Sequence, residues 1–170
     1  MLDTLRFSTN YRTRHRWEVF RFHYFIQRRK LTMGNLTKNI SQHELKCKCG
    51  NCEVQIQSHE LIIQVVQEGC DHFANLLGIE RVKLIITSAA RCYEYNRLPF
   101  EFGGAGSIDE SQHPRCNAMD IQLFAGDVQI MPSLVYAYFC TKYPDQFGVG
   151  SYKTFTHVDS RSVRARWGLV

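Results

Sequence analysis

The chain has 170 residues, of which 44% are hydrophobic and 12% aromatic, so it can bury one ordinary core and is not disordered by composition. Its formal charge of +5 would suit a nucleic-acid or membrane partner, but the charge is unevenly distributed. Residues 1–32 carry eight basic and two acidic side chains, whereas the rest carry 13 and 14. We therefore expect no nucleic-acid partner for the domain itself. We also expect no transmembrane helix, because the sequence has no apolar run of about 18 residues.

The first segment is a basic arm over residues 1–32, in which arginines are mixed with aromatic residues. This composition is compatible with binding phosphates or anionic lipid. A disordered leader, or sequence upstream of a start at Met33, explains it at least as well. Arg21 and His23 interrupt its apolar run, which does not fit a secretory signal peptide. We expect a domain over residues 33–170, made in the cytoplasm without a signal peptide.

Three of the seven cysteines follow the arm in the cluster Cys47-Lys48-Cys49-Gly50-Asn51-Cys52. The odd total leaves at least one cysteine outside any set of intramolecular disulfides. A C-x-C-x-x-C cluster can hold zinc if a fourth ligand joins it, and His43 or Cys70 are candidates for that ligand. A disulfide knot, or reduced thiols that pack as small hydrophobes, are the alternatives.

The remaining predicted elements are two helices and several short strands. Apolar residues at helical spacing predict a helix that begins after the capping residues Ser58 and His59 and ends at Gly78. A buried strand over residues 82–87, a strand end and turn over 88–96, and a glycine-rich loop over 99–107 come next. A strand over 118–123, a helix from Pro132 that ends before Pro144, and a hairpin over 147–159 complete the chain. This order predicts an α+β domain with a small, mostly antiparallel sheet packed with helices.

A histidine and an aspartate flank the start of the second predicted strand. The turn between His113 and Asp120 can fold back, so that the imidazole approaches the strand-borne carboxylate. His157 lies on a later strand, and the period of two puts Asp159 on the same face. Two imidazoles and one carboxylate, with a fourth position open, are typical of catalytic zinc. On spacing alone, a surface histidine and a strand-edge aspartate are the simpler interpretation.

A longer pattern gives these residues a context. The sequence reads Ser111-x-His113-x4-Ala118-x-Asp120 and then Phe155-x-His157-Val158-Asp159. Together they resemble the zinc D-alanyl-D-alanine carboxypeptidase and peptidoglycan endopeptidase family, which shares its fold with the hedgehog signalling domain, and its phage and prophage branch in particular. Thr87 to Asn96 is similar to the family's Ser-Gly-Tyr-Arg-x4-Asn segment. Further similar stretches are residues 36–52, 148–152 and 164–167, so the resemblance covers the chain from about residue 34 to 168.

The resemblance implies a zinc-dependent hydrolase of peptide bonds in peptidoglycan stem peptides or cross-links. It implies that His113, Asp120 and His157 bind Zn2+ and that Arg91 binds the substrate and stabilises negative charge that develops during the reaction. It leaves open whether the enzyme is a D,D-carboxypeptidase or an endolysin-type endopeptidase.

Two further residues are implied at the site. Ser111 is expected to orient the loop or to hydrogen-bond near the site and bind substrate. It is not expected to be a nucleophile, because a metal-bound His113 leaves it without a free base. Asp159 is the candidate general base, or alternatively a residue that orients a metal ligand.

The chain departs from the family pattern in three places. Cys116 replaces a common glycine, Ala89-Ala90 replaces Gly-Tyr, and Thr154 stands where some relatives carry the acidic base. The last departure keeps an alternative open, a non-catalytic module that binds cell wall or builds a virion. A third possibility is that residues 1–32 carry the function by binding nucleic acid or membrane. We expect action at the cell wall after release, or association with a virion, and the sequence indicates no oligomeric state.

Overall fold

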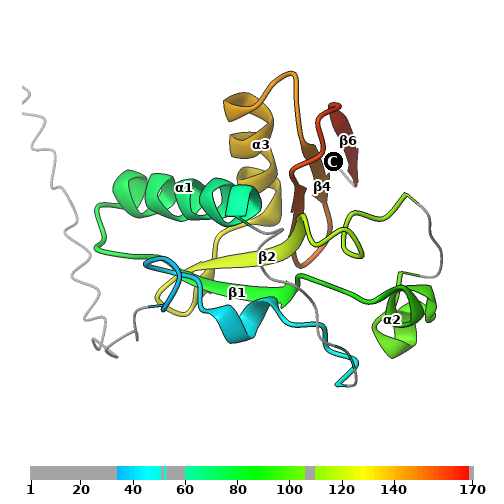
Figure 1. Cartoon of the computed structure of the whole chain (residues 1–170). Coiled ribbons are helices and arrows are strands. Elements are labelled where there is room, and N and C mark those ends of the chain that lie inside the picture. The colour runs from blue at the N-terminus through cyan, green and yellow to red at the C-terminus, as the bar shows by residue number, and fades with distance from the viewer. Residues whose placement is uncertain (1–33, 51, 53–59, 106–109, 169–170) are drawn as a thin grey trace, which may run out of the picture.

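The computed structural model describes residues 34–50, 52, 60–105 and 110–168 (Figure 1). The predicted arm over residues 1–32, its boundary at Met33 and the capping residues Ser58 and His59 lie outside this described part. In chain order, the helices and strands are η1 (Gln42–Leu45), α1 (Glu60–Leu77), β1 (Lys83–Ser88), α2 (Tyr93–Arg97), η3 (Phe100–Phe102), β2 (Ala118–Ala125), β3 (Val128–Gln129), α3 (Pro132–Lys142), β4 (Gly148–Ser151), β5 (Thr156–Asp159) and β6 (Ala165–Gly168).

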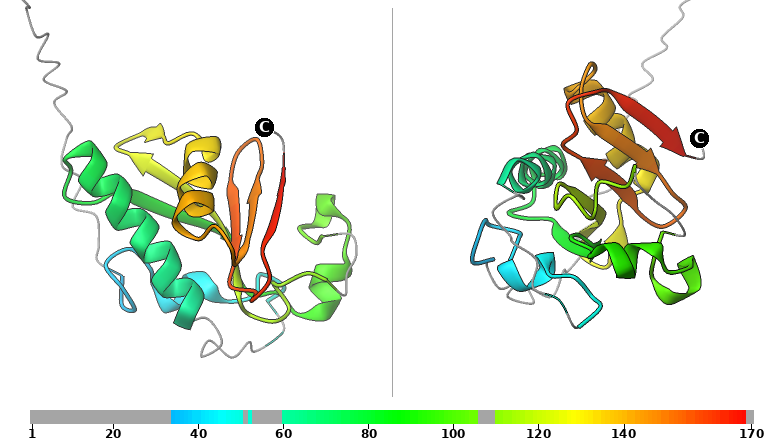
Figure 2. Two further views of the ribbon diagram at one scale, coloured as in Figure 1. Left: turned by 90° about the horizontal axis from the view of Figure 1, so that it is seen from above. Right: turned by 45° about the vertical axis from the view of Figure 1, so that its right-hand side comes forward.

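One six-stranded sheet organises the chain, in the order β1-β2-β5-β4-β6, with β3 paired to β2. The β1, β2, β5 and β4 ladders are antiparallel, and β6 joins β4 in parallel. Helices α1 and α3 lie over one face of the sheet, while α2 lies at the end remote from them (Figures 1 and 2). The predicted α+β class with a small, mostly antiparallel sheet is confirmed.

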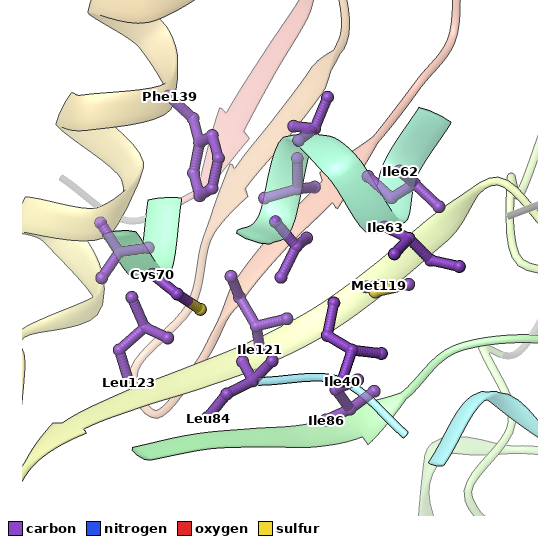
Figure 3. Packing of buried hydrophobic residues seen from close by; sticks show 14 of the residues in the cluster. Ile40, Ile62, Ile63, Cys70, Leu84, Ile86, Met119, Ile121, Leu123 and Phe139 are labelled. Atoms are coloured by element: carbon purple, nitrogen blue, oxygen red, sulfur yellow. The ribbon is translucent and has the colours of Figure 1, made fainter. Parts of the chain in front are cut away.

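Successive side chains of strand β2 point alternately into the core and to the opposite face of the sheet. Met119, Ile121 and Leu123 point toward α1 and are almost fully buried (Figure 3). Because side chains alternate along a strand, Asp120 and Gln122 point to the face without α1 and α3. The same alternation puts Val158 of β5 in the core. The helices therefore cover the apolar face of the sheet, and the polar face is left for the site.

Helix α1 has the apolar stripe that its sequence predicts, with Ile62, Val66 and Phe73 buried. Gly69 lies on this stripe against the ring of Phe139 from α3, which is fully buried. A Cβ atom at Gly69 would lie 2.6 Å from Phe139 Cζ. The absence of a side chain therefore sets how closely the two helices pack. No helix in the described part of the chain has both the length and the apolar character needed to cross a bilayer.

The structure differs from the prediction in the segment over residues 88–96, where the expected turn contains the start of α2. This helix has five residues, which is too short to produce a helical period of apolar side chains. Its N-cap is Cys92, whose sulfur accepts the Tyr95 N–H at 3.4 Å. A thiol is not among the usual capping side chains, so the sequence carries no recognisable start signal here.

Replacing Gly69 with valine is expected to lower the free energy of unfolding by about 2–3 kcal/mol, because the new side chain overpacks the contact with Phe139. Gln64→Val is the matched control, since Gln64 is an exposed residue of the same helix. This control is expected to change stability by less than about 1 kcal/mol. Urea denaturation of both variants measures the difference, and equal stabilities would contradict the packing described here.

Candidate metal centre

Two neighbouring strands place Asp120 and His157 directly opposite each other. Asp120 of β2 pairs with His157 of β5 in the antiparallel register, and both side chains point to the face without α1 and α3. His157 Nδ1 lies 2.8 Å from Asp120 Oδ1. The sheet register alone therefore brings one imidazole to the carboxylate.

A tight turn brings the second imidazole to the same carboxylate. The turn closes with the Cys116 N–H donating to the His113 carbonyl at 3.0 Å. Cys116 has a φ of +56°, a left-handed conformation that the glycine common at this position would adopt more easily. For a residue with a side chain, this conformation costs about 1 kcal/mol of conformational free energy. His113 Nδ1 donates to the Ala89 carbonyl at 2.5 Å, which leaves Nε2 facing Asp120 Oδ2 at 3.4 Å.

Burial and charge shift the three titrating groups in different directions. Burial lowers the pKa of His113, and Asp120 only partly opposes this effect. Burial also disfavours the charged form of His157, but hydrogen bonds to Asp120 and Asp159 outweigh it and raise its pKa to about 9. Burial acts to raise the pKa of Asp120, yet the two histidines hold that pKa well below the usual range. Without a metal, the carboxylate is thus ionised between a neutral His113 and a protonated His157.

Arg91 is the next residue around Asp120. Its Nη2 donates to Asp120 Oδ2 at 3.0 Å, and its Nε donates to the Ser88 hydroxyl at 2.8 Å. A bulge in β1 just before Ser88 shifts the register so that Ser88 pairs with Asp120. A guanidinium has five N–H donors, so donors of Arg91 beyond these two bonds are available to the cleft that it lines.

Asp159 lies behind His157 and has a fully buried side chain. Its Oδ2 is 3.1 Å from His157 Nε2, and both of its oxygens accept from Arg161 at 2.7 Å. The Gly148 N–H also donates to Asp159 Oδ1, and a Cβ at Gly148 would lie 2.1 Å from Oδ2. Together these contacts hold the pKa of Asp159 below its usual range against the effect of burial.

A cleft of about 1060 Å³ opens in front of the two histidines and Asp120. Arg91 and Ser111 line it, and the Ser111 hydroxyl donates to the buried Asn96 amide oxygen at 3.3 Å. Trp167 of β6 forms part of an aromatic wall, with its ring centroid 5.2 Å from that of His157. Asp159 is not among the described residues that line this cleft.

The donor set fits a divalent metal ion. His113, Asp120 and His157 each offer a ligand atom, and these atoms lie within 4.8 Å of one another. Both carboxylate oxygens already face an imidazole nitrogen, and both outer ring nitrogens are held by acceptors, namely the Ala89 carbonyl and Asp159. Such outer partners fix the tautomer and orientation of metal-binding histidines. Three protein ligands beside a cleft leave a position for water or substrate.

Comparison with known sequences agrees with this geometry. The model of the Peptidase M15 family matches residues 38–159. The chain belongs to this family. The match supports the predicted likeness to zinc D-alanyl-D-alanine carboxypeptidases. Membership of the M15 family supports a metallopeptidase, and His113, Asp120 and His157 form a group that can bind metal. Neither the curated proteins nor the solved structures gave a significant match.

The structure also shows site residues that sequence reasoning missed in this M15 chain. Ser88, the Ala89 carbonyl and Arg161 hold Arg91, His113 and Asp159 in place. A main-chain carbonyl carries no sequence signal. Arg161 stands two residues after Asp159 and makes a bidentate contact with its carboxylate. This contact depends on the turn after β5, which the sequence does not reveal.

Metal uptake at the centre formed by His113, Asp120 and His157 is expected to release about one proton at pH 7, because His157 is protonated below about pH 9 and must lose its Nδ1 proton to bind. His113 and Asp120 contribute none, since their pKa values are lowered. Affinity should therefore rise about tenfold per pH unit toward pH 9 and then level off. Calorimetric titration with Zn2+ in buffers of different ionisation enthalpy, with the proton release of His113→Ala subtracted from that of the wild type, measures the protons released at this centre. Uptake there without proton release would contradict this assignment.

Proposed function

We propose that the protein hydrolyses peptide bonds in peptidoglycan stem peptides or cross-links, with Zn2+ held by His113, Asp120 and His157. The observation that carries the proposal is the joint presence of this buried ligand set, the adjacent Arg91 guanidinium and the open cleft in a Peptidase M15 chain. A zinc ion bound there would supply Lewis acidity that activates water and polarises the scissile carbonyl.

The cleft has the charge to receive an anionic peptide. Among its described lining residues, Lys48, Arg91 and Arg161 are basic, whereas Glu110 and Asp120 are acidic. Stem peptides carry free carboxylates, and a guanidinium binds a carboxylate or an oxyanion with two parallel hydrogen bonds. We assign this role to Arg91, because Ser88 and Asp120 fix its orientation at the site. Ser111 lines the same cleft and is the proposed hydrogen-bond partner for the substrate backbone.

For Asp159, we propose a positioning role in which it acts through His157. Its carboxylate accepts from His157 Nε2 and is fully buried, and Arg161 occupies both of its oxygens. A general base must reach the proton of the attacking water, and these contacts direct Asp159 away from the cleft. The orienting role and the base role were both open from the sequence, and the contacts favour the first.

One observation keeps a second candidate function in view. Thr154 lines the cleft at the position where some relatives carry the acidic base. A chain that binds stem peptides at this cleft without cleaving them would be a non-catalytic cell-wall-binding module or a virion component. For either function we propose action at the cell wall after release, or association with a virion, since the substrate or ligand would be peptidoglycan.

Digestion of purified peptidoglycan and of synthetic stem peptides that end in D-Ala-D-Ala tests the proposal. We expect the zinc-loaded full-length chain to cleave at least one of them, and the His157→Ala variant to lose both the metal at this centre and the cleavage. His72→Ala is the control, because His72 is an exposed residue of α1, which covers the other face of the sheet. Mass spectrometry of the products distinguishes loss of a terminal D-alanine from opening of a cross-link. Binding without any cleavage would favour the non-catalytic module.

The Asp159→Asn variant separates the two roles of Asp159. If Asp159 positions His157, zinc affinity should fall about 10–100-fold, while hydrolysis is largely restored at saturating zinc. If it were the base, affinity would be unchanged and kcat would fall about 100–10,000-fold at saturating zinc. Competition with a zinc chelator measures affinity, and peptide hydrolysis at several zinc concentrations measures kcat.

A further inference from the structure

A second group of metal-binding side chains lies outside the candidate metal centre. The sulfur atoms of Cys47, Cys49, Cys52 and Cys92 all lie within 4.8 Å of one another. The Cys49 and Cys52 sulfurs are 3.1 Å apart, and all four cysteines are partly exposed. The fourth sulfur thus comes from Cys92, 40 residues beyond the cluster in sequence. Cys70, one of the two partners considered from the sequence, lies in the hydrophobic core instead.

The fold holds these two cysteine-bearing segments together by several other contacts. The Ala90 N–H donates to the Leu45 carbonyl at 3.3 Å, and Lys48 Nζ donates to the Thr87 carbonyl at 2.5 Å. The Cys92 N–H donates to Cys47 Sγ at 3.3 Å, and Cys92 Sγ accepts from the main chain of α2. The cluster is therefore positioned by backbone contacts and is not a chance meeting of side chains.

We propose that Cys47, Cys49, Cys52 and Cys92 bind a structural zinc ion as four thiolates. Four cysteine ligands and a closed coordination sphere are typical of structural zinc. Zn–S bonds of about 2.3 Å in a tetrahedron place sulfur atoms about 3.8 Å apart. The four sulfurs, mutually within 4.8 Å, surround a space of this size, and the Cys49 and Cys52 sulfurs, 3.1 Å apart, would move apart on binding. On binding, the four thiols lose their protons to solvent, and the filled site carries a net charge of −2.

The alternative chemistry for this cluster is disulfide formation, which joins sulfurs in pairs. Two disulfides need only two short distances, whereas a tetrathiolate site needs all six pairs of sulfurs to be close, as they are here. Four thiolates at such separations would repel one another, so a cation between them is needed for all four to bind as anions. The arrangement of all four sulfurs around one point thus favours a metal ion over paired disulfides.

The zinc site would fix one wall of the substrate cleft. Cys92 follows Arg91 directly, and Arg91 donates to Asp120 in the candidate metal centre. Lys48, between Cys47 and Cys49, also lines the cleft. An ion that ties Cys47, Cys49 and Cys52 to Cys92 would therefore hold in place two cations that line the cleft. The inference does not depend on the proposed function, because the two ligand sets share no residue.

Metal analysis of the full-length chain, purified with reductant and dialysed, tests the proposal. We expect about two zinc ions per chain in the wild type and about one in His113→Ala. Cys92→Ser should lose the thiolate zinc and retain the other, and the double variant should hold none. Cys140→Ser is the control, because Cys140 is a partly exposed cysteine outside the cluster, and it should keep both ions.

A second measurement on chains with intact cysteines guards against misfolding of the Cys92→Ser variant. In His113→Ala, a thiol-specific mercurial should release the remaining zinc as four thiols react, and substituted Co2+ should show thiolate charge-transfer absorption. A zinc-free His113→Ala chain, cysteines paired as disulfides in the intact mass, or iron in place of zinc would overturn the proposal. A wild-type chain that holds the thiolate zinc but hydrolyses none of the peptides would instead count against the proposed function alone.

Discussion

The carboxylate of Asp120 is buried on the face of the sheet without α1 and α3, and the site is built around it. A buried carboxylate is costly unless its oxygens are paired, and here His113, His157 and Arg91 supply the partners. Each partner comes from a different element, so the turn before β2, strand β5 and the segment after β1 must meet at this point. The same convergence produces a ligand set suited to a divalent cation, which would replace the protons that otherwise balance the charge.

The glycine and tryptophan pattern near the C-terminus serves the same constraint. Gly148 lets β4 approach Asp159, and Gly150 leaves room for the Trp167 ring, since a Cβ there would lie 2.5 Å from that ring. Trp167 then packs beside His157, with its indole N–H donating to the Tyr152 hydroxyl at 2.9 Å. The stretches around residues 148–152 and 164–167 therefore shape one side of the cleft, although none of their side chains belongs to the metal ligand set.

Local periodicity accounts for what the sequence could predict. The 3.6-residue stripe of α1 and the alternation of Met119, Asp120 and Ile121 in β2 are properties of neighbouring residues, so both elements and the face of Asp120 were predictable. Parallel pairing of β6 with β4, the thiol-capped α2 and the approach of Cys92 to the cysteine cluster depend on contacts distant in sequence. The orienting contacts of His113 with a main-chain carbonyl are equally invisible to a residue pattern. The three candidate ligands were therefore predictable from motif and period, whereas the groups that hold them required the fold.

The most direct test of this account is a crystal structure of the zinc-loaded protein, with anomalous diffraction measured at the zinc edge. We predict an anomalous peak about 2.0–2.2 Å from His113 Nε2, His157 Nδ1 and a carboxylate oxygen of Asp120, with Asp159 on the far side of His157. A zinc-loaded crystal with no peak among these three side chains, or with the ion bound to Asp159 instead, would contradict it.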